Sequence, residues 1–91
     1  MKKAAKITIH GNVQGVFFRN YIKEKADSLG LKGFVRNLEG GDVELVVEGD
    51  IDHVDKMHEL CRQAPKHAVI SSTELKEIEF QDFTEFQILH I

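Results

Sequence analysis

The segment of residues 11–19 constrains the fold most, because the periodicity of the chain changes across it. Before it, residues 6–10 alternate apolar and polar side chains, which is typical of a half-buried strand. After it, apolar residues recur with helical spacing. Gly11 and Gly15 lie within the segment, and glycine lets a backbone bend tightly and approach a ligand closely. The segment is therefore predicted to be a loop that joins a strand to a helix.

The rest of the chain alternates between the same two periodicities. It predicts a helix over residues 19–29, strands over 32–38 and 43–48, a helix over 51–63, a strand over 71–80 and a tail strand over 86–90. The apolar register slips at Ser71 and Ser72, where we expect a bend or a bulge. The order β-α-β-β-α-β predicts a ferredoxin-like α+β sandwich, with one antiparallel sheet and both helices on one face. The length of 91 residues fits a single domain, 1–91.

Glycine and proline mark the ends of several predicted elements. We expect Gly30 to cap the first helix in the left-handed region and Pro65 to end the second helix. We expect Gly40 and Gly41 to adopt positive φ in the turn between the two middle strands.

Composition disfavours several kinds of function. The hydrophobic fraction of 42% and the charged fraction of 30% are ordinary for a globular domain. The net charge of −3 gives no broad attraction to nucleic acid, so an anion site must be built locally. The single cysteine, Cys61, allows no internal disulfide and is expected in the core. No apolar run is long enough to span a membrane, and we expect a cytoplasmic protein without a membrane or nucleic-acid partner.

The predicted loop and the start of the helix after it suit an anion. The first backbone N–H groups of a helix have no partner within the helix, and the helix dipole adds positive potential there. Arg19 follows directly, and its planar guanidinium suits phosphate or carboxylate. An arginine in the first turn of a helix is also commonly an ordinary surface residue. The residue types indicate a candidate cradle for a phosphate-sized dianion.

Topology brings a second polar residue to the same edge of the sheet. A β-α-β crossover makes the strands 6–10 and 32–38 parallel, with the strand 43–48 between them. Asn37, near the end of the second of these strands, is then roughly 10 Å from the cradle, which is two strand spacings. Asparagine at a strand end also commonly forms a turn.

Two motifs resemble the signatures of one enzyme family. Residues 11–19 read GNVQGVFFR, and residues 33–37 and 41–44 read GFVRN and GDVE. This pattern is similar to that of the acylphosphatases, small hydrolases of acyl phosphates, and the resemblance covers residues 7–88. It implies the same ferredoxin-like fold and the same activity. Three positions depart from the family pattern in loop surfaces or turns, namely Phe17, Gly40 and Ala64.

The resemblance also implies roles for individual residues. Arg19 corresponds to the phosphate-binding arginine, and Asn37 to the asparagine that positions the attacking water. Backbone N–H groups that would help to hold the phosphate are those of Gln14, Gly15, Val16, Phe17 and Phe18. No metal and no cofactor are implied. The implied partners are a small acyl phosphate and inorganic phosphate, the latter as product and competitive inhibitor, and a monomer is expected.

Other functions stay open at this point. A non-catalytic ferredoxin-like module could bind an anion or a small ligand, although it gives no reason for Arg19 and Asn37 to occur together. The chain could also be an acylphosphatase-like module of a larger carbamoyl-transfer protein, although its first and last residues favour a free-standing enzyme. An RNA-binding or metal-carrying module is disfavoured by the negative charge and by the absence of a Cys-x-x-Cys motif. We expect three phenylalanines near the C-terminus to lie in the core, namely Phe80, Phe83 and Phe86.

Overall fold

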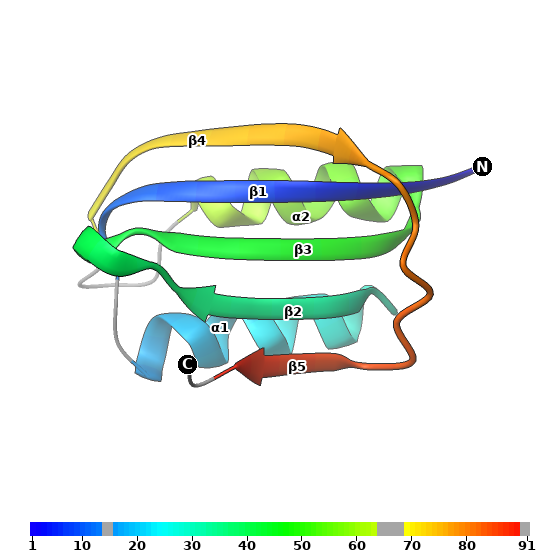
Figure 1. The fold of residues 1–91 in the computed structure, drawn as a ribbon, viewed down its shortest axis with the longest axis horizontal. Coiled ribbons are helices and arrows are strands. Elements are labelled where there is room, and N and C mark those ends of the chain that lie inside the picture. Colours follow the sequence, from blue (N-terminus) through cyan, green and yellow to red (C-terminus); the bar gives the residue numbers. More distant parts are fainter. Residues whose placement is uncertain (14–15, 64–68, 90–91) are drawn as a thin grey trace.

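The computed structural model describes residues 1–13, 16–63 and 69–89, which form a two-layer sandwich (Figure 1). Within these residues, five strands form one sheet, and two α-helices cover one of its faces. In chain order the elements are β1 (Lys2–Asn12), α1 (Val16–Ser28), β2 (Lys32–Asn37), the 3-10 helix η1 (Glu39–Gly41), β3 (Val43–Asp50), α2 (Ile51–Arg62), β4 (Val69–Ile78) and β5 (Phe86–Leu89). This order confirms the predicted ferredoxin-like α+β class. None of the helices in the described part of the chain has the length and apolar character that crossing a membrane requires.

The strands lie in the order β4-β1-β3-β2-β5. β3 pairs antiparallel with both β1 and β2, so β1 and β2 run parallel with β3 between them, as predicted. β4 is antiparallel to its neighbour β1. β5 pairs in parallel with β2, so the predicted antiparallel arrangement holds for four strands and the described sheet as a whole is mixed. The reason is the connection after β4, which crosses from one edge of the sheet to the other before β5 begins (Figure 1).

The core lies between the sheet and the helices. Alternation along β1 turns Ile7 and Ile9 toward the helices, and both are fully buried. Helical spacing turns Phe18 and Ile22 of α1 toward the same space. Core residues of the other elements are Val35, Val43, Leu45, Val47, Val54, Met57, Cys61 and Phe86. Burial raises the pKa of the Cys61 thiol to about 12, and its predicted place in the core is confirmed.

The structure corrects the predicted starts of β1 and α1. β1 begins at Lys2 rather than at residue 6, because Ala4 and Ala5 are buried and paired with β3 and β4. Alanine gives little strand signal, so this extension depends on tertiary pairing. α1 begins at Val16 rather than at residue 19. A short apolar run shows no helical period by itself, and periodicity could not place this boundary.

Glycines at the ends of two elements adopt the predicted left-handed conformations. Gly30 has a φ of +68°, and the N–H of the next residue donates to a carbonyl of α1 at 2.9 Å, which closes the helix. Gly40 and Gly41, between β2 and β3, have φ of +88° and +106°. Pro65, which we expect to end α2, lies outside the described residues, and α2 ends at Arg62.

The predicted irregularity in the last long strand is a β-bulge. The pairing of β1 with β4 shifts between His10 and Gly11, and Ser71 is the extra residue on β4. Glycine is needed at position 11 because a Cβ there would collide with the backbone carbonyl oxygen of Val69. The absence of a side chain at Gly11 therefore allows the backbone of β4 to lie close to the end of β1.

The connection between β4 and β5 is anchored at one end of the uncovered face of the sheet. Glu48 of β3 is only 4% exposed, and its carboxylate accepts hydrogen bonds from the backbone N–H groups of Gln81 and, at 3.0 Å, of Phe83. The ring of Phe83 packs edge-on against Phe34 of β2, with ring centroids 5.8 Å apart. Phe80 is 43% exposed, so the prediction that it lies in the core is wrong.

Candidate active site

The predicted site residues come from elements that meet at one end of the sandwich. In Figure 1, the C-terminal ends of β1 and β2 and the N-terminal end of α1 all lie at the left. β1 and β2 run parallel, so their C-terminal ends lie at the same end of the sheet. The connection between β4 and β5 lies at the opposite end (Figure 1). The elements that carry the predicted site residues and the connection between β4 and β5 therefore lie at opposite ends of the sheet.

Asn37 is the last residue of β2 and lies in one row of the sheet with the end of β1. It pairs with Val43 of β3, and Val43 pairs with Ile9 of β1. Side chains in such a row point to the same face, so Asn37 turns toward the helix-covered face, as Ile9 does. β1 and β2 are two strand spacings apart, about 10 Å, as the predicted topology requires.

The carboxamide oxygen of Asn37 is buried and accepts no hydrogen bond from any residue that the structure describes. Leaving a buried acceptor unpaired costs roughly 1–3 kcal/mol of folding stability. Most buried polar atoms in native proteins have a partner, so an unpaired one calls for a physical reason. Here the oxygen lies at the end of a strand, where a water or a ligand could donate to it.

Arg19 lies in the first turn of α1 and is half-buried. Because α1 begins at Val16, the N–H groups of its first three residues have no carbonyl acceptor within the helix. The first turn contains no acidic residue that would neutralise the positive end of the helix dipole. Gln14 and Gly15, which are also predicted to bind phosphate through their N–H groups, lie outside the described residues.

The two phenylalanines at the start of α1 have different surroundings. Phe18 is buried in the core, and its ring stacks with that of Tyr21 at a centroid distance of 6.3 Å. Phe17 is 84% exposed. The departure from the family pattern at Phe17 therefore changes the surface beside the helix start, as predicted, while its backbone continues the helix.

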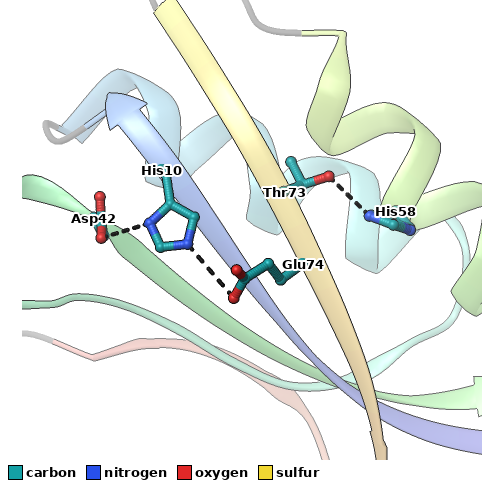
Figure 2. Close-up of polar contacts among 5 residues, drawn as sticks. All are labelled: His10, Asp42, His58, Thr73 and Glu74. Carbon is teal, nitrogen blue, oxygen red and sulfur yellow. Dashed lines mark hydrogen bonds and ion pairs between the residues drawn. The ribbon is translucent and has the colours of Figure 1, made fainter.

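A polar cluster lies at the same end of the sheet (Figure 2). Nδ1 of His10 lies 2.7 Å from Oδ2 of Asp42, and Nε2 lies 3.6 Å from Oε2 of Glu74. His10 is near the end of β1, Asp42 closes the turn between β2 and β3, and Glu74 belongs to β4. The hydrogen bond to Asp42 is the main reason that the pKa of His10 is raised above its usual value.

This cluster was not predicted from the sequence. His10 and Asp42 are 32 positions apart, and only the pairing of β1 with β3 brings them together. The pairing register of β1 and β3 is the information from which this contact could have been predicted. Because Ile9 pairs with Val43, position 10 faces position 42 in an antiparallel pair.

The residue types at this end of the sheet suit two chemical roles. A guanidinium and helix N-terminal N–H groups suit an oxyanion, and a carboxamide oxygen suits a water. In residues 1–13, 16–63 and 69–89, no group of three or more His, Cys, Asp or Glu side chains is arranged to hold a metal ion. His58 bonds instead to Oγ1 of Thr73 at 3.0 Å (Figure 2), and its partial burial lowers its pKa.

Strand order and helix placement put the protein in the class of ferredoxin-like α+β sandwiches. A family model described as acylphosphatase matches residues 5–88. The chain belongs to the acylphosphatase family, which confirms the resemblance seen in the two motifs and the hydrolase class that it implied.

Individual relatives agree with this assignment. The chain is 42% identical over 88 residues to an acylphosphatase of Methylococcus capsulatus, with 96% of each chain covered. The structure of an acylphosphatase from Coxiella burnetii matches with a TM-score of 0.91 at 38% identity, over 97% of this chain and 93% of that one. The crystal structure of T. kodakarensis HypF matches with a TM-score of 0.83 at 34% identity, over 98% of this chain but only 12% of that one. The fold therefore also occurs as a small part of a much longer protein.

Proposed function

We propose that this protein hydrolyses the carboxyl–phosphate bond of small acyl phosphates to a carboxylate and inorganic phosphate. Membership of the acylphosphatase family supports this substrate class. Water attacks phosphorus in line with the leaving carboxylate, so one P–O bond forms while the P–O bond to the acyl group breaks. The carboxylate leaves with the bonding electron pair, and a phosphate oxygen of the substrate takes the proton of the water.

Arg19 and the N–H groups around the start of α1 are proposed to hold the phosphate. The N–H groups are those of Gln14, Gly15, Val16, Phe17 and Phe18. Charge on the equatorial oxygens of the transferring group is the main feature to be stabilised in phosphoryl transfer. Since the guanidinium and the amides supply positive potential, the proposed mechanism uses no metal and no cofactor.

Asn37 is proposed to orient the attacking water, and its buried, unpaired oxygen is the observation that carries this role. The oxygen would accept a hydrogen bond from the water and so direct a lone pair of the water toward phosphorus. Two strand spacings, about 10 Å, leave room for a phosphate and a water beside it. A carboxylate is a good leaving group, so the reaction needs no strong general acid.

We further propose that inorganic phosphate, as the product, competes with the substrate for the same groups. A monomer in the cytoplasm, without a nucleic-acid or membrane partner, is part of the same proposal. The net charge of −3 supports the exclusion of nucleic acid, because such binding draws mainly on positive surface charge.

A non-catalytic module that binds an anion or a small ligand is the second candidate. It stays a candidate because the fold also occurs as a small part of a longer protein, as the match to 12% of the HypF chain shows. Turnover separates the two candidates. A binding module would hold phosphate without hydrolysing an acyl phosphate.

The test is hydrolysis of benzoyl phosphate, followed by ultraviolet absorbance, for the wild type, Arg19→Ala and Arg62→Ala. We expect fast turnover by the wild type and a loss of roughly 10²–10³-fold in kcat/KM for Arg19→Ala, the usual cost of removing one preorganised donor to a transition state. Arg62 is an exposed arginine at the end of α2, and its variant should keep wild-type turnover. Equal rates for Arg19→Ala and the wild type would refute the role of Arg19. A folded wild type without turnover would favour the binding module.

A further inference from the structure

The turn after Asn37 spans residues 38–42 and joins β2 to β3. It contains Gly40 and Gly41, both at positive φ, and glycine loses the most conformational freedom when a turn becomes ordered. The short helix η1 within the turn contributes no buried residue. A backbone hydrogen bond closes the turn, from the N–H of Leu38 to the carbonyl oxygen of Asp42 at 2.8 Å. Asn37 precedes this turn and pairs with Val43 in the sheet, so its position is set by the β2–β3 pairing together with the turn that Asp42 closes.

A histidine on a neighbouring strand holds Asp42. His10 lies 2.7 Å from Asp42 through Nδ1, and Nε2 on the other side of its ring lies 3.6 Å from Glu74. Figure 2 shows the ring between the two carboxylates. β1 is paired along both edges, with β3 and β4, so the histidine is mounted on a rigid strand. We refer to His10, Asp42 and Glu74 as the His10 clasp.

We propose that His10 is a positioning residue: it holds Asp42, fixes the turn from Leu38 to Asp42 and so fixes the carboxamide of Asn37. The inference rests on the proposed function, in which Asn37 orients the attacking water. The path is short, because Asn37 adjoins Leu38, whose N–H bonds to Asp42. A displacement of about 1 Å in a catalytic geometry can lower a rate by roughly 10²-fold.

Because His10 can gain or lose a proton, the His10 clasp should make kcat depend on pH. The hydrogen bond to Asp42 favours the protonated imidazole and raises the pKa of His10. The charged groups that act on the ring are Asp42 and Glu74. Glu44 lies one row further along β3, opposite Thr8, and pairs with Arg36 at 2.9 Å. Since the pKa is raised, the protonated ring, which can donate to both carboxylates, is present below that pKa, and above it the neutral ring keeps one N–H and can donate to only one of them. The share of kcat that depends on His10 should therefore decline on the alkaline side.

The experiment compares His10→Ala with His58→Ala as the matched control. His58 is another half-buried histidine with a hydroxyl partner, Thr73, and it lies on α2 (Figure 2). We expect His10→Ala to lower kcat for benzoyl phosphate by roughly 2- to 150-fold, which corresponds to the coupling energies of residues in one network. KM, and Ki for inorganic phosphate, should change by less than about twofold, because the phosphate-binding groups are intact. The alkaline decline in kcat should disappear in His10→Ala and persist in His58→Ala.

A double-mutant cycle separates positioning from a general structural role. In an Asn37→Ala background, His10→Ala should lower kcat no further, because its effect passes through Asn37. Losses that multiply, or a folded His10→Ala with wild-type kcat, would overturn the inference. If His10→Ala does not fold, His10→Gln and Asp42→Asn take its place, since each keeps a hydrogen-bonding group without the charge pair. Losses that multiply, or a wild-type kcat in these variants, would again overturn the inference.

A readout other than activity keeps this inference distinct from the proposed function. The side-chain NH2 signals of Asn37 in a proton–nitrogen NMR spectrum should shift in His10→Ala and stay in place in His58→Ala. Unchanged Asn37 signals in His10→Ala would refute the positioning role. A wild type without turnover would refute the proposed function, and the NMR comparison would still decide whether His10 positions Asn37.

Discussion

At the scale of single residues, the candidate site combines donors and one acceptor from different parts of the chain. Arg19 and the first N–H groups of α1 are donors, whereas the buried oxygen of Asn37 is an acceptor. An oxyanion needs donors, and a water that attacks it needs an acceptor to orient it. The two kinds of group therefore divide the proposed reaction between them.

Replacing Asn37 by Ala should affect catalysis much more than stability. We expect kcat for benzoyl phosphate to fall by roughly 10²-fold with little change in KM, because the side chain acts on the water rather than on bound phosphate. The free energy of unfolding should stay within about 1 kcal/mol of the wild type, since the change also removes a buried unpaired oxygen. Steady-state kinetics and urea unfolding measure the two quantities.

The matched control is Asn20→Ala, which removes an exposed carboxamide from α1. It should leave both quantities unchanged. A rise in KM with unchanged kcat for Asn37→Ala would show that Asn37 binds substrate instead of orienting water, and would contradict its proposed role.

The sequence motifs predicted Arg19 and Asn37 as site residues, but they did not indicate His10. Both motif residues lie in short contiguous patterns, so local reading and a family resemblance suffice to select them. His10 and Asp42 are 32 positions apart and become partners only through strand register. The buried state of the Asn37 oxygen likewise depends on packing and is invisible in the residue pattern.

At the scale of elements, periodicity predicted the order of strands and helices because each amphipathic element carries its own repeat. It did not place the start of β1, where Ala4 and Ala5 are buried by pairing rather than by strand propensity. Nor did it predict that β5 runs parallel to β2, because pairing direction is set by the path of the preceding connection. The predictions from periodicity were therefore wrong where contacts between distant parts of the chain, rather than the local residue pattern, determine the structure.

The connection before β5 offers a test of whether fold and site are separable. Glu48→Gln replaces a buried carboxylate that accepts two backbone N–H groups by an amide whose NH2 cannot accept. We expect a loss of roughly 1–3 kcal/mol in the free energy of unfolding. kcat should be unchanged, since Glu48 pairs with Ala4 and Lys32 at the end of the sheet away from Asn37.

Urea unfolding and benzoyl phosphate kinetics check this prediction, with Glu77→Gln as the control. Glu77 is an exposed glutamate on β4, and its variant should match the wild type in both measurements. A kcat for Glu48→Gln reduced as strongly as the stability would show that the two ends of the sheet are coupled.

At the scale of the whole molecule, the candidate site and the anchored connection between β4 and β5 lie at opposite ends of the sheet. One end carries the anchored connection to β5, and the other gathers the start of α1, the end of β2 and the His10 clasp (Figure 1). The split order, with β3 between the parallel strands β1 and β2, brings the two motif segments to one edge. The arrangement thus follows from topology that the order of elements already implied.

The central claim is that a water held at this edge attacks the phosphorus of an acyl phosphate. Hydrolysis of benzoyl phosphate in water enriched in oxygen-18 tests it most directly, with mass spectrometry of both products. We expect the wild type to place the label in inorganic phosphate and none in benzoate, because the P–O bond is the one that breaks. Label in benzoate would mean attack at the carbonyl carbon and would refute the proposed attack at phosphorus.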